Sequence, residues 1–172
     1  MFPSSLPGLT RQSRDRPRIA GLFAALLLTL LPNTASAGSD AVAQLIDQVN
    51  RTRVAHGLQP LTPEARLTAA ARAHADAMAS GDCFAHVCDG GPTLVERIVR
   101  AGYPYRTVAE NLAAGMARAE AVVKAWMASP GHRRNLLRPD LKEAGVAYVL
   151  RENDDGQHRY RHYWTMTFGA RL

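Results

Sequence analysis

The sequence lacks the long hydrophobic runs and the short catalytic motifs that mark several common protein classes. After position 37, no segment approaches the ~20 consecutive apolar residues that a membrane-spanning helix needs, so no stable span is expected there. Neither a Gly-x-Ser-x-Gly elbow nor a His-Glu-x-x-His helix is present, and these are the familiar signatures of serine hydrolases and zinc proteases. Internal repeats and low-complexity segments are also absent from this part of the chain.

A concentrated basic surface is missing as well. Of the 21 basic and 15 acidic residues, four basic and one acidic residue lie in the first 37 positions, so the remainder has 17 against 14, or +3. The remaining basic residues are scattered, with Arg133-Arg134 as the only adjacent pair. A dedicated nucleic-acid partner is therefore not expected, because such proteins gather basic residues in a patch or stripe.

The N-terminal segment has the pattern of a secretory signal peptide. Four arginines, the last of them Arg18, precede an apolar run from Ile19 to Leu31, and Ala35-Ser36-Ala37 follows as a cleavage site. A helix of that run is about 20 Å long, shorter than the roughly 30 Å hydrocarbon core of a bilayer. We therefore expect residues 1–37 to be removed and residues 38–172 to form one domain, secreted or periplasmic. An uncleaved anchor is the alternative.

The later pattern predicts helices first and a hairpin last. Four helices are expected. The first runs from about Ser39 or Asp40 to His56, and the second follows a hydroxyl cap at Thr62 and ends at Gly81. The third begins at Thr93, and the fourth runs from about Arg118 to Ser129, where Pro130-Gly131 stops it. Residues 105–113 fit a short strand or an irregular segment, and residues 145–150 and 160–168 flank a strong turn signal at 153–156. This order predicts an α+β fold in which helices pack on a small antiparallel sheet.

The two cysteines, Cys83 and Cys88, lie in one short loop of a chain bound for an oxidising compartment. Paired thiols in such a compartment usually form a disulfide, which we expect here. The alternative is a thiolate metal site that uses both cysteines and His86, although a fourth ligand is not evident nearby.

Three polar residues stand where the local pattern predicts burial or a tight loop: His86, Glu110 and His132. Taken singly, each is weak evidence, because a lone histidine is more often a packing residue and a lone buried acid can simply pair with an arginine. His74 lies on the inner stripe of the second helix and is interpreted as a core histidine. Glu96 follows Thr93 at the spacing of a capping box and is assigned that structural role.

Five segments, taken in order, resemble a known family across nearly all of residues 38–172. They are Leu67 to Met78, Phe84-Ala85-His86, Ala109-Glu110-Asn111-Leu112-Ala113, Trp126 to His132, and Gly145-Val146-Ala147. Together they are similar to the signatures of CAP proteins, the cysteine-rich secretory, antigen 5 and pathogenesis-related superfamily, in its short bacterial form. The resemblance implies an α-β-α sandwich with a central cleft of two histidines and two acids that binds a divalent metal such as Zn²⁺ in some members.

Carried over by position, the resemblance makes His86 and His132 the cleft histidines and Glu110 the first acid. Asn111 is the asparagine of the same Glu-Asn-Leu motif. The second acid is missing, because Ser129 stands where the eukaryotic pattern has a glutamate. A hydroxyl cannot act as a second charged base, so a mechanism that needs two acids is not supported.

Two functions follow from these residues. The first is a secreted binding module whose cleft and grooves hold a lipid or another cell-envelope component, with metal occupancy modulating the cleft. The second is a metal-assisted hydrolase of peptide or envelope substrates, in which His86 and His132 ligate Zn²⁺ at about 2.0–2.1 Å and Glu110 is the third ligand or the base. A structural envelope protein with an unused cleft is a third reading.

Overall fold

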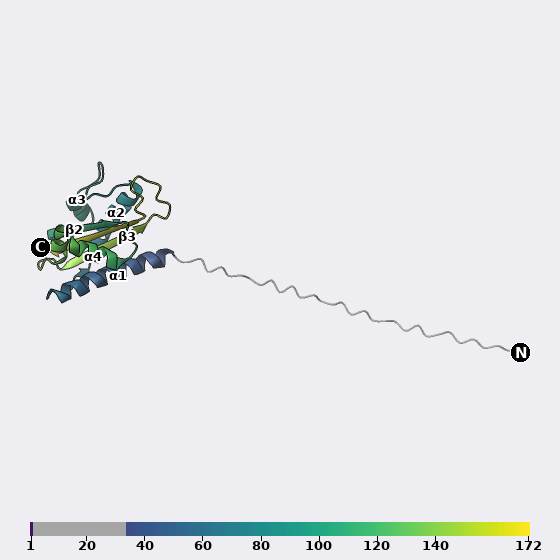
Figure 1. Ribbon diagram of the computed structural model, residues 1–172, viewed down its shortest axis with the longest axis horizontal. Coiled ribbons are helices and arrows are strands. Elements are labelled where there is room, and N and C mark those ends of the chain that lie inside the picture. The colour runs from purple at the N-terminus through teal and green to yellow at the C-terminus, as the bar shows by residue number, and fades with distance from the viewer. Residues whose placement is uncertain (2–33) are drawn as a thin grey trace. The chain divides into compact units, whose positions relative to one another are not determined.

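The computed structural model describes Met1 and residues 34–172 (Figure 1). The apolar run of the expected signal peptide lies outside the described residues. Nine elements follow one another: α1 Thr34–Ala55, β1 Thr62–Pro63, α2 Ala65–Ser80, α3 Leu94–Arg100, β2 Tyr105–Ala114, α4 Ala119–Ala128, α5 Pro130–Leu136, β3 Glu143–Leu150 and β4 His162–Arg171. No helix among these described residues combines the length and the hydropathy needed to cross a bilayer.

The sheet has the order β1-β3-β4-β2, so the long strand β2 lies at one edge. The pair β3/β4 is antiparallel, as predicted for the hairpin. Residues 105–113, for which the sequence left a strand or an irregular segment open, lie in strand β2, which pairs antiparallel with β4. The two-residue strand β1 pairs with β3 in parallel, which makes the sheet mixed where a purely antiparallel one was expected. The prediction missed this strand because two residues are too few to show an alternating pattern.

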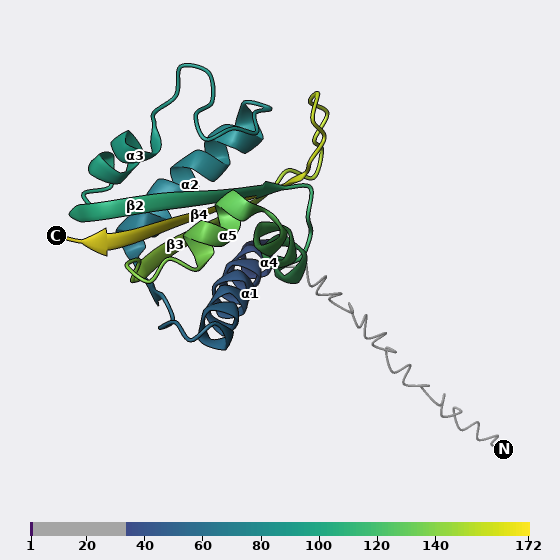
Figure 2. The ribbon, with the colours of Figure 1, turned by 60° about the vertical axis from the view of Figure 1, so that its left-hand side comes forward.

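Helices cover both faces of the sheet, and the predicted α+β sandwich is confirmed. Figures 1 and 2 show α2 and α3 on one face and α1, α4 and α5 on the other. The alternation of β4 accounts for the two layers, because successive side chains point to opposite faces. Trp164 joins the cluster formed with α1 and α4, whereas Tyr163 packs against Met78 of α2.

Helix α2 packs its predicted inner stripe directly on the sheet. All the stripe residues are buried: Leu67, Ala70, Ala71, His74, Ala75 and Met78. The small side chains allow the helix backbone to approach β3, and a Cβ placed on Gly145 would overlap the backbone at Leu67 and Thr68. Gly145 is therefore required by the close approach of a helix to a strand.

The starts of two helices differ from the sequence-based expectation. Helix α1 begins at Thr34 and not at Ser39 or Asp40, since the alanines at 35 and 37 favour helix. The cap of α2 is Glu64, whose side chain accepts a hydrogen bond from the backbone N–H of Leu67, and not the hydroxyl of Thr62.

Helix α4 stops at Ala128, close to its predicted end. Pro130 then opens a further helix, α5, which the sequence analysis did not predict, instead of only ending α4. Proline is well suited to a first helical turn, where its missing N–H has no partner to lose. His132 is therefore carried by a helix and not by a loop.

A buried arginine joins α1 to the segment after α5. Arg53 is 1% exposed, and its guanidinium donates hydrogen bonds to the carbonyl oxygens of Gln59, Leu136, Arg138 and Leu141 at 2.7–3.2 Å. Carbonyl oxygens satisfy its donors without a carboxylate, and the contact with Leu136 holds a carbonyl that the end of α5 leaves free. The position of α5 is thereby set from the side of α1.

We expect Gly145→Ala to lower the free energy of unfolding by at least about 1–3 kcal/mol, because the added methyl group has no space against α2. Gly131→Ala is the matched control: its Cβ would meet only the end of Arg134 at 4.0 Å, and the change should stay within about 1 kcal/mol. Urea unfolding followed by circular dichroism measures both. Equal stability of the two variants would contradict the close packing of α2 on β3.

Candidate functional site

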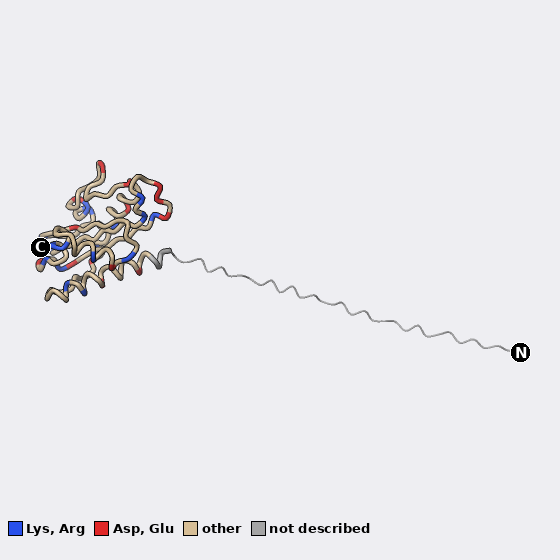
Figure 3. Tube along the Cα trace, in the orientation of Figure 1, with Lys and Arg blue, Asp and Glu red and all other residues tan. Residues whose placement is uncertain are grey.

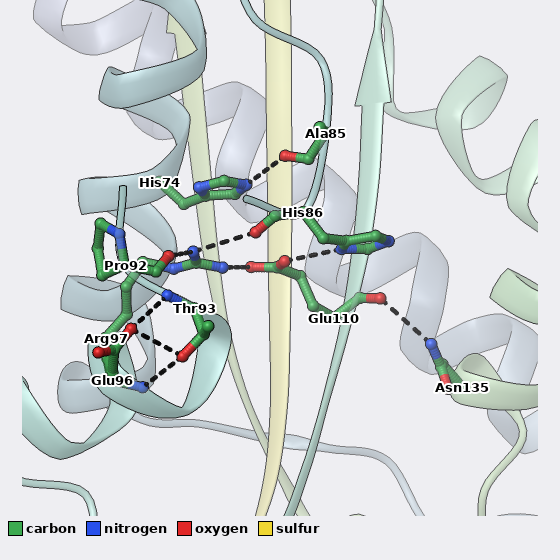
Figure 4. Close-up of polar contacts among 9 residues, drawn as sticks. All are labelled: His74, Ala85, His86, Pro92, Thr93, Glu96, Arg97, Glu110 and Asn135. Atoms are coloured by element: carbon green, nitrogen blue, oxygen red, sulfur yellow. Dashed lines mark hydrogen bonds and ion pairs between the residues drawn. The ribbon is translucent and has the colours of Figure 1, made fainter. Parts of the chain in front are cut away.

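The centre of the site is a buried ion pair between Glu110 of β2 and Arg97 of α3 (Figure 4). The Nη2 atom of Arg97 lies 2.6 Å from Oε2 of Glu110, and each side chain is 2% exposed. The remaining Glu110 oxygen, Oε1, lies 2.9 Å from Nδ1 of His86. Both oxygens of the carboxylate therefore have a partner within the protein.

Strand alternation explains why Glu110 points toward α3. Val108 and Leu112, two residues to either side, pack in the clusters of the α2 and α3 layer, whereas Ala109 and Ala113 pack toward α1 and α4. Glu110 shares the face of Val108 and Leu112. An unpaired carboxylate there would be costly, and the arginine of α3 neutralises it.

The loop from Gly81 to Pro92 holds His86 at this carboxylate. The predicted Cys83–Cys88 disulfide is present and closes the loop around it. Two carbonyl oxygens of the loop are also tied down: that of Ala85 lies 2.9 Å from Nε2 of His74, and that of His86 lies 3.3 Å from Nη1 of Arg97. The His86 backbone is thus anchored, while its side chain remains 59% exposed.

The contact with Glu110 occupies only one nitrogen of the His86 ring. Nδ1 faces the carboxylate, and Nε2 has no hydrogen-bond partner among residues 34–172. A carboxylate that contacts one nitrogen fixes the orientation of the ring and directs the other nitrogen outward. His86 therefore offers an exposed, oriented Nε2.

His132 approaches from α5, on the other side of the edge strand β2. Burial lowers the pKa of His132, and the charge of His86 lowers it further. The ring lies 6.5 Å from that of Trp126, between centroids. Within the described part of the chain, the ring nitrogens of His132 have no hydrogen-bond partner.

Asn111 and Asn135 position His132. The Asn111 side chain is fully buried and donates to the carbonyl oxygen of His132 at 3.0 Å. Asn135 donates to Oδ1 of Asn111 at 2.9 Å and to the backbone carbonyl of Glu110 at 3.2 Å. Asn111, which the resemblance places in the cleft, thus hydrogen-bonds to α5, and the two amides together hold α5 on β2.

The fourth cleft position has a backbone role. Ser129 is the residue between α4 and α5, and its carbonyl accepts the 2.8 Å hydrogen bond of the Arg133 N–H that starts α5. Its hydroxyl has no hydrogen-bond partner among the described residues.

Sequence reasoning missed Arg97 and Asn135. The signal for Arg97 was indirect, since a buried acid requires a cation and this arginine follows the capping-box residue Glu96 inside a short helix. Nothing in the sequence pointed to Asn135. It lies in α5, a helix that the sequence analysis did not predict, and an asparagine outside a predicted helix is taken for a loop residue.

A three-ligand metal site of His86, His132 and Glu110 does not fit this geometry. Glu110 is held by the guanidinium of Arg97, whose positive charge at 2.6 Å opposes a cation on the same oxygen. Among residues 34–172, no group of three or more His, Cys, Asp or Glu side chains is arranged to hold a metal ion. The alternative thiolate site is wrong, because both sulfurs are consumed in the disulfide. A metal would find at most the two imidazoles.

His74 is confirmed as a core histidine. It is 2% exposed, and one ring nitrogen contacts the carbonyl of Ala85. Burial lowers its pKa, an effect that the nearby Glu110 partly opposes. Its role is to hold the loop that carries His86.

Removing one member of the buried ion pair should be far more harmful than removing both charges. Arg97→Met leaves Glu110 unpaired, and we expect it to lower the free energy of unfolding by about 3–5 kcal/mol. The double variant Arg97→Met/Glu110→Gln should recover part of this loss. Urea unfolding at neutral pH measures the free energy of unfolding of Arg97→Met, Glu110→Gln and the double variant. If the loss in the double variant equalled the sum of the losses in the two single variants, the pairing would be contradicted.

Stability should also fall in mild acid because of His74. A folded-state pKa below the ordinary value of about 6.5 means that the unfolded chain binds more protons as the pH drops through that value. The free energy of unfolding then decreases by up to about 1.4 kcal/mol per pH unit for this histidine. In His74→Gln, whose side chain can still donate to the Ala85 carbonyl, the free energy of unfolding should fall less steeply from pH 7 to pH 5 than in His158→Gln, which replaces an exposed histidine. Equal slopes would contradict the assignment.

Comparison with known proteins agrees with this architecture. The chain matches the Cysteine-rich secretory protein family, CAP, over residues 46–168. The YkwD protein of Bacillus subtilis (strain 168) is 36% identical over 121 residues, which cover 70% of this chain and 46% of that protein. The membrane protein YlbC of the same organism is 31% identical over 103 residues, which cover 60% of this chain and 30% of its own. This chain thus spans less than half the length of these relatives.

Solved structures show the same fold. An extracellular protein with an SCP domain from Bacillus anthracis str. Ames has a TM-score of 0.70 and 26% identity, covering 83% of this chain and 44% of that one. An outer surface protein of Borrelia burgdorferi also has a TM-score of 0.70, at 22% identity, covering 77% of this chain and 94% of its own. Because the family match includes most of the described residues and every cleft position, the chain belongs to the CAP family of cysteine-rich secretory proteins.

Proposed function

We propose that this CAP protein is a secreted or periplasmic binding module whose cleft holds a lipid or another cell-envelope component at His86 and His132. The observation that carries the proposal is the double engagement of Glu110, which contacts Arg97 and His86 through its two oxygens. With the acid occupied, the groups left to meet a ligand are the outward nitrogen of His86 and the ring of His132. Both imidazoles can donate or accept hydrogen bonds, which suits recognition of a polar group.

Three observations support secretion, two on this chain and one on a related protein. The N-terminal pattern is that of a signal peptide, the Cys83–Cys88 disulfide favours an oxidising compartment, and the related SCP-domain protein of Bacillus anthracis is described as extracellular. A cell-envelope ligand is the class of molecule that such a protein meets first.

A divalent metal is not part of the proposed binding step. Zn²⁺ would have only the imidazoles of His86 and His132 as protein ligands, since Glu110 is paired with Arg97. Sites in which zinc is structural have four protein ligands, and catalytic ones commonly have three. The chemistry that the ion supplies when bound is polarisation of an attached water or ligand group.

Hydrolysis remains the second candidate, and one observation favours it. A carboxylate that orients a histidine and leaves its Nε2 free is also the arrangement of a general base. In this arrangement His86 and not Glu110 would accept the proton, and Glu110 would stabilise the charged ring. The binding proposal is preferred because no nucleophilic side chain contacts Nε2 within residues 34–172.

Native mass spectrometry of protein purified from its own cell envelope tests the binding proposal. We expect a retained non-covalent mass that is lost in His86→Ala/His132→Ala, because these imidazoles hold the ligand. The matched control, His56→Ala/His158→Ala, removes two exposed imidazoles elsewhere and should keep the mass.

A clean spectrum for the unmodified protein would contradict the proposal. Turnover on a panel of peptides and esters would favour hydrolysis instead, provided that it is abolished by His86→Ala and retained in the control variant.

A further inference from the structure

A hollow of about 610 Å³ lies along α5 and the segment that follows it, separate from the imidazoles of the cleft. Its apolar surface comes from Pro130, Leu137 and Pro139, and its polar surface comes from Asn135 and three arginines at positions 133, 134 and 138. The volume lies in the range of sites for small organic ligands, which is roughly 300–1,000 Å³.

Two of the polar groups in this hollow already have partners. Arg138 forms a bidentate pair with Asp140 and also donates to the hydroxyl of Thr107 at 2.9 Å. The side-chain amide of Asn135 donates to Asn111 and to the Glu110 carbonyl of the sheet. Arg138 and Asn135 therefore line the hollow, but their hydrogen-bond donors are used in bonds to other protein groups.

Arg133 and Arg134 differ from these residues. Both are exposed, and within residues 34–172 neither guanidinium has a hydrogen-bond or ion-pair partner. Two positively charged groups that line one hollow attract an anion to it. The planar guanidinium fork matches phosphate and carboxylate oxygens in pairs.

We propose that this hollow binds the phosphate head of an anionic cell-envelope lipid, as a second site that goes beyond the proposed cleft function and does not use its two imidazoles. The two free arginines meet the phosphate, and the apolar surface of Pro130, Leu137 and Pro139 meets the adjoining carbon chain. A free inorganic ion would use the arginines and leave this apolar surface exposed to water, so the combination favours an amphiphile.

The charge pattern elsewhere favours a single head group over a polyanion. Basic and acidic residues are interspersed along the described chain (Figure 3), and Arg133-Arg134 is the only adjacent basic pair within residues 34–172. Nucleic-acid binding proteins commonly make about 6–10 phosphate contacts, whereas this hollow has two unpaired guanidinium groups. His132 lies on the same helix, α5, but does not line the hollow.

Sedimentation with lipid vesicles tests the proposal on the purified protein. We expect binding to vesicles of phosphatidylcholine and phosphatidylglycerol in equal parts, and none to phosphatidylcholine alone. Each arginine should contribute about a factor of five, so Arg133→Gln/Arg134→Gln should weaken binding roughly 25-fold. The matched control, Arg66→Gln/Arg100→Gln, removes the same charge from α2 and α3 and should change binding by less than about twofold.

Equal losses in the two double variants would overturn the proposal, because binding would then follow net charge alone. Glycerol 3-phosphate and inorganic phosphate serve as competitors: failure to displace the vesicles supports the lipid source, and full displacement at millimolar concentration would overturn it. His86→Ala/His132→Ala should retain vesicle binding. A retained envelope ligand in native spectra, together with no vesicle binding, would overturn this inference and leave the proposed function standing.

Discussion

The arrangement of the site depends on the buried ion pair of Arg97 and Glu110. Two charges that are each 2% exposed need partners for their polar atoms, and the structure supplies them for every polar atom of the two charged groups except Nε of Arg97, which is buried without a hydrogen-bond partner. Arg97 adds the carbonyls of Pro92 and His86, and Glu110 adds the His86 ring. The same bonds that neutralise the charges therefore hold the loop that presents His86.

The ion pair of Arg97 and Glu110 lies at the edge of the sheet, where the candidate site residues are found. Strand β2 is an edge strand, and the two imidazoles come from different elements: His86 is held by Glu110 of β2 and Arg97 of α3, and His132 lies on α5. Helix α5 is held by Asn111 and Asn135 on one side and by Arg53 on the other. One seven-residue helix thus links the cleft to the hollow lined by Arg133 and Arg134.

Much of the fold could be predicted because local patterns and burial agree. The inner stripe of α2, the capping box of Thr93 and Glu96, and the β3/β4 hairpin each satisfy one rule of spacing, and the structure has all three. The errors lie where two rules compete at one residue. Pro130 ends one helix and begins the next, and Thr62 can cap a helix or pair in a strand, so local spacing could not choose between them.

By itself, the sequence determined the α+β class, the family resemblance, the disulfide and the identity of three candidate residues, because these rest on spacing and on residue chemistry. Only the tertiary structure decided what Glu110 does. Its partner Arg97 is 13 residues away along the chain, and their contact exists because α3 packs over the edge strand. Charge compensation in a protein interior depends on distance in space, which no local pattern contains.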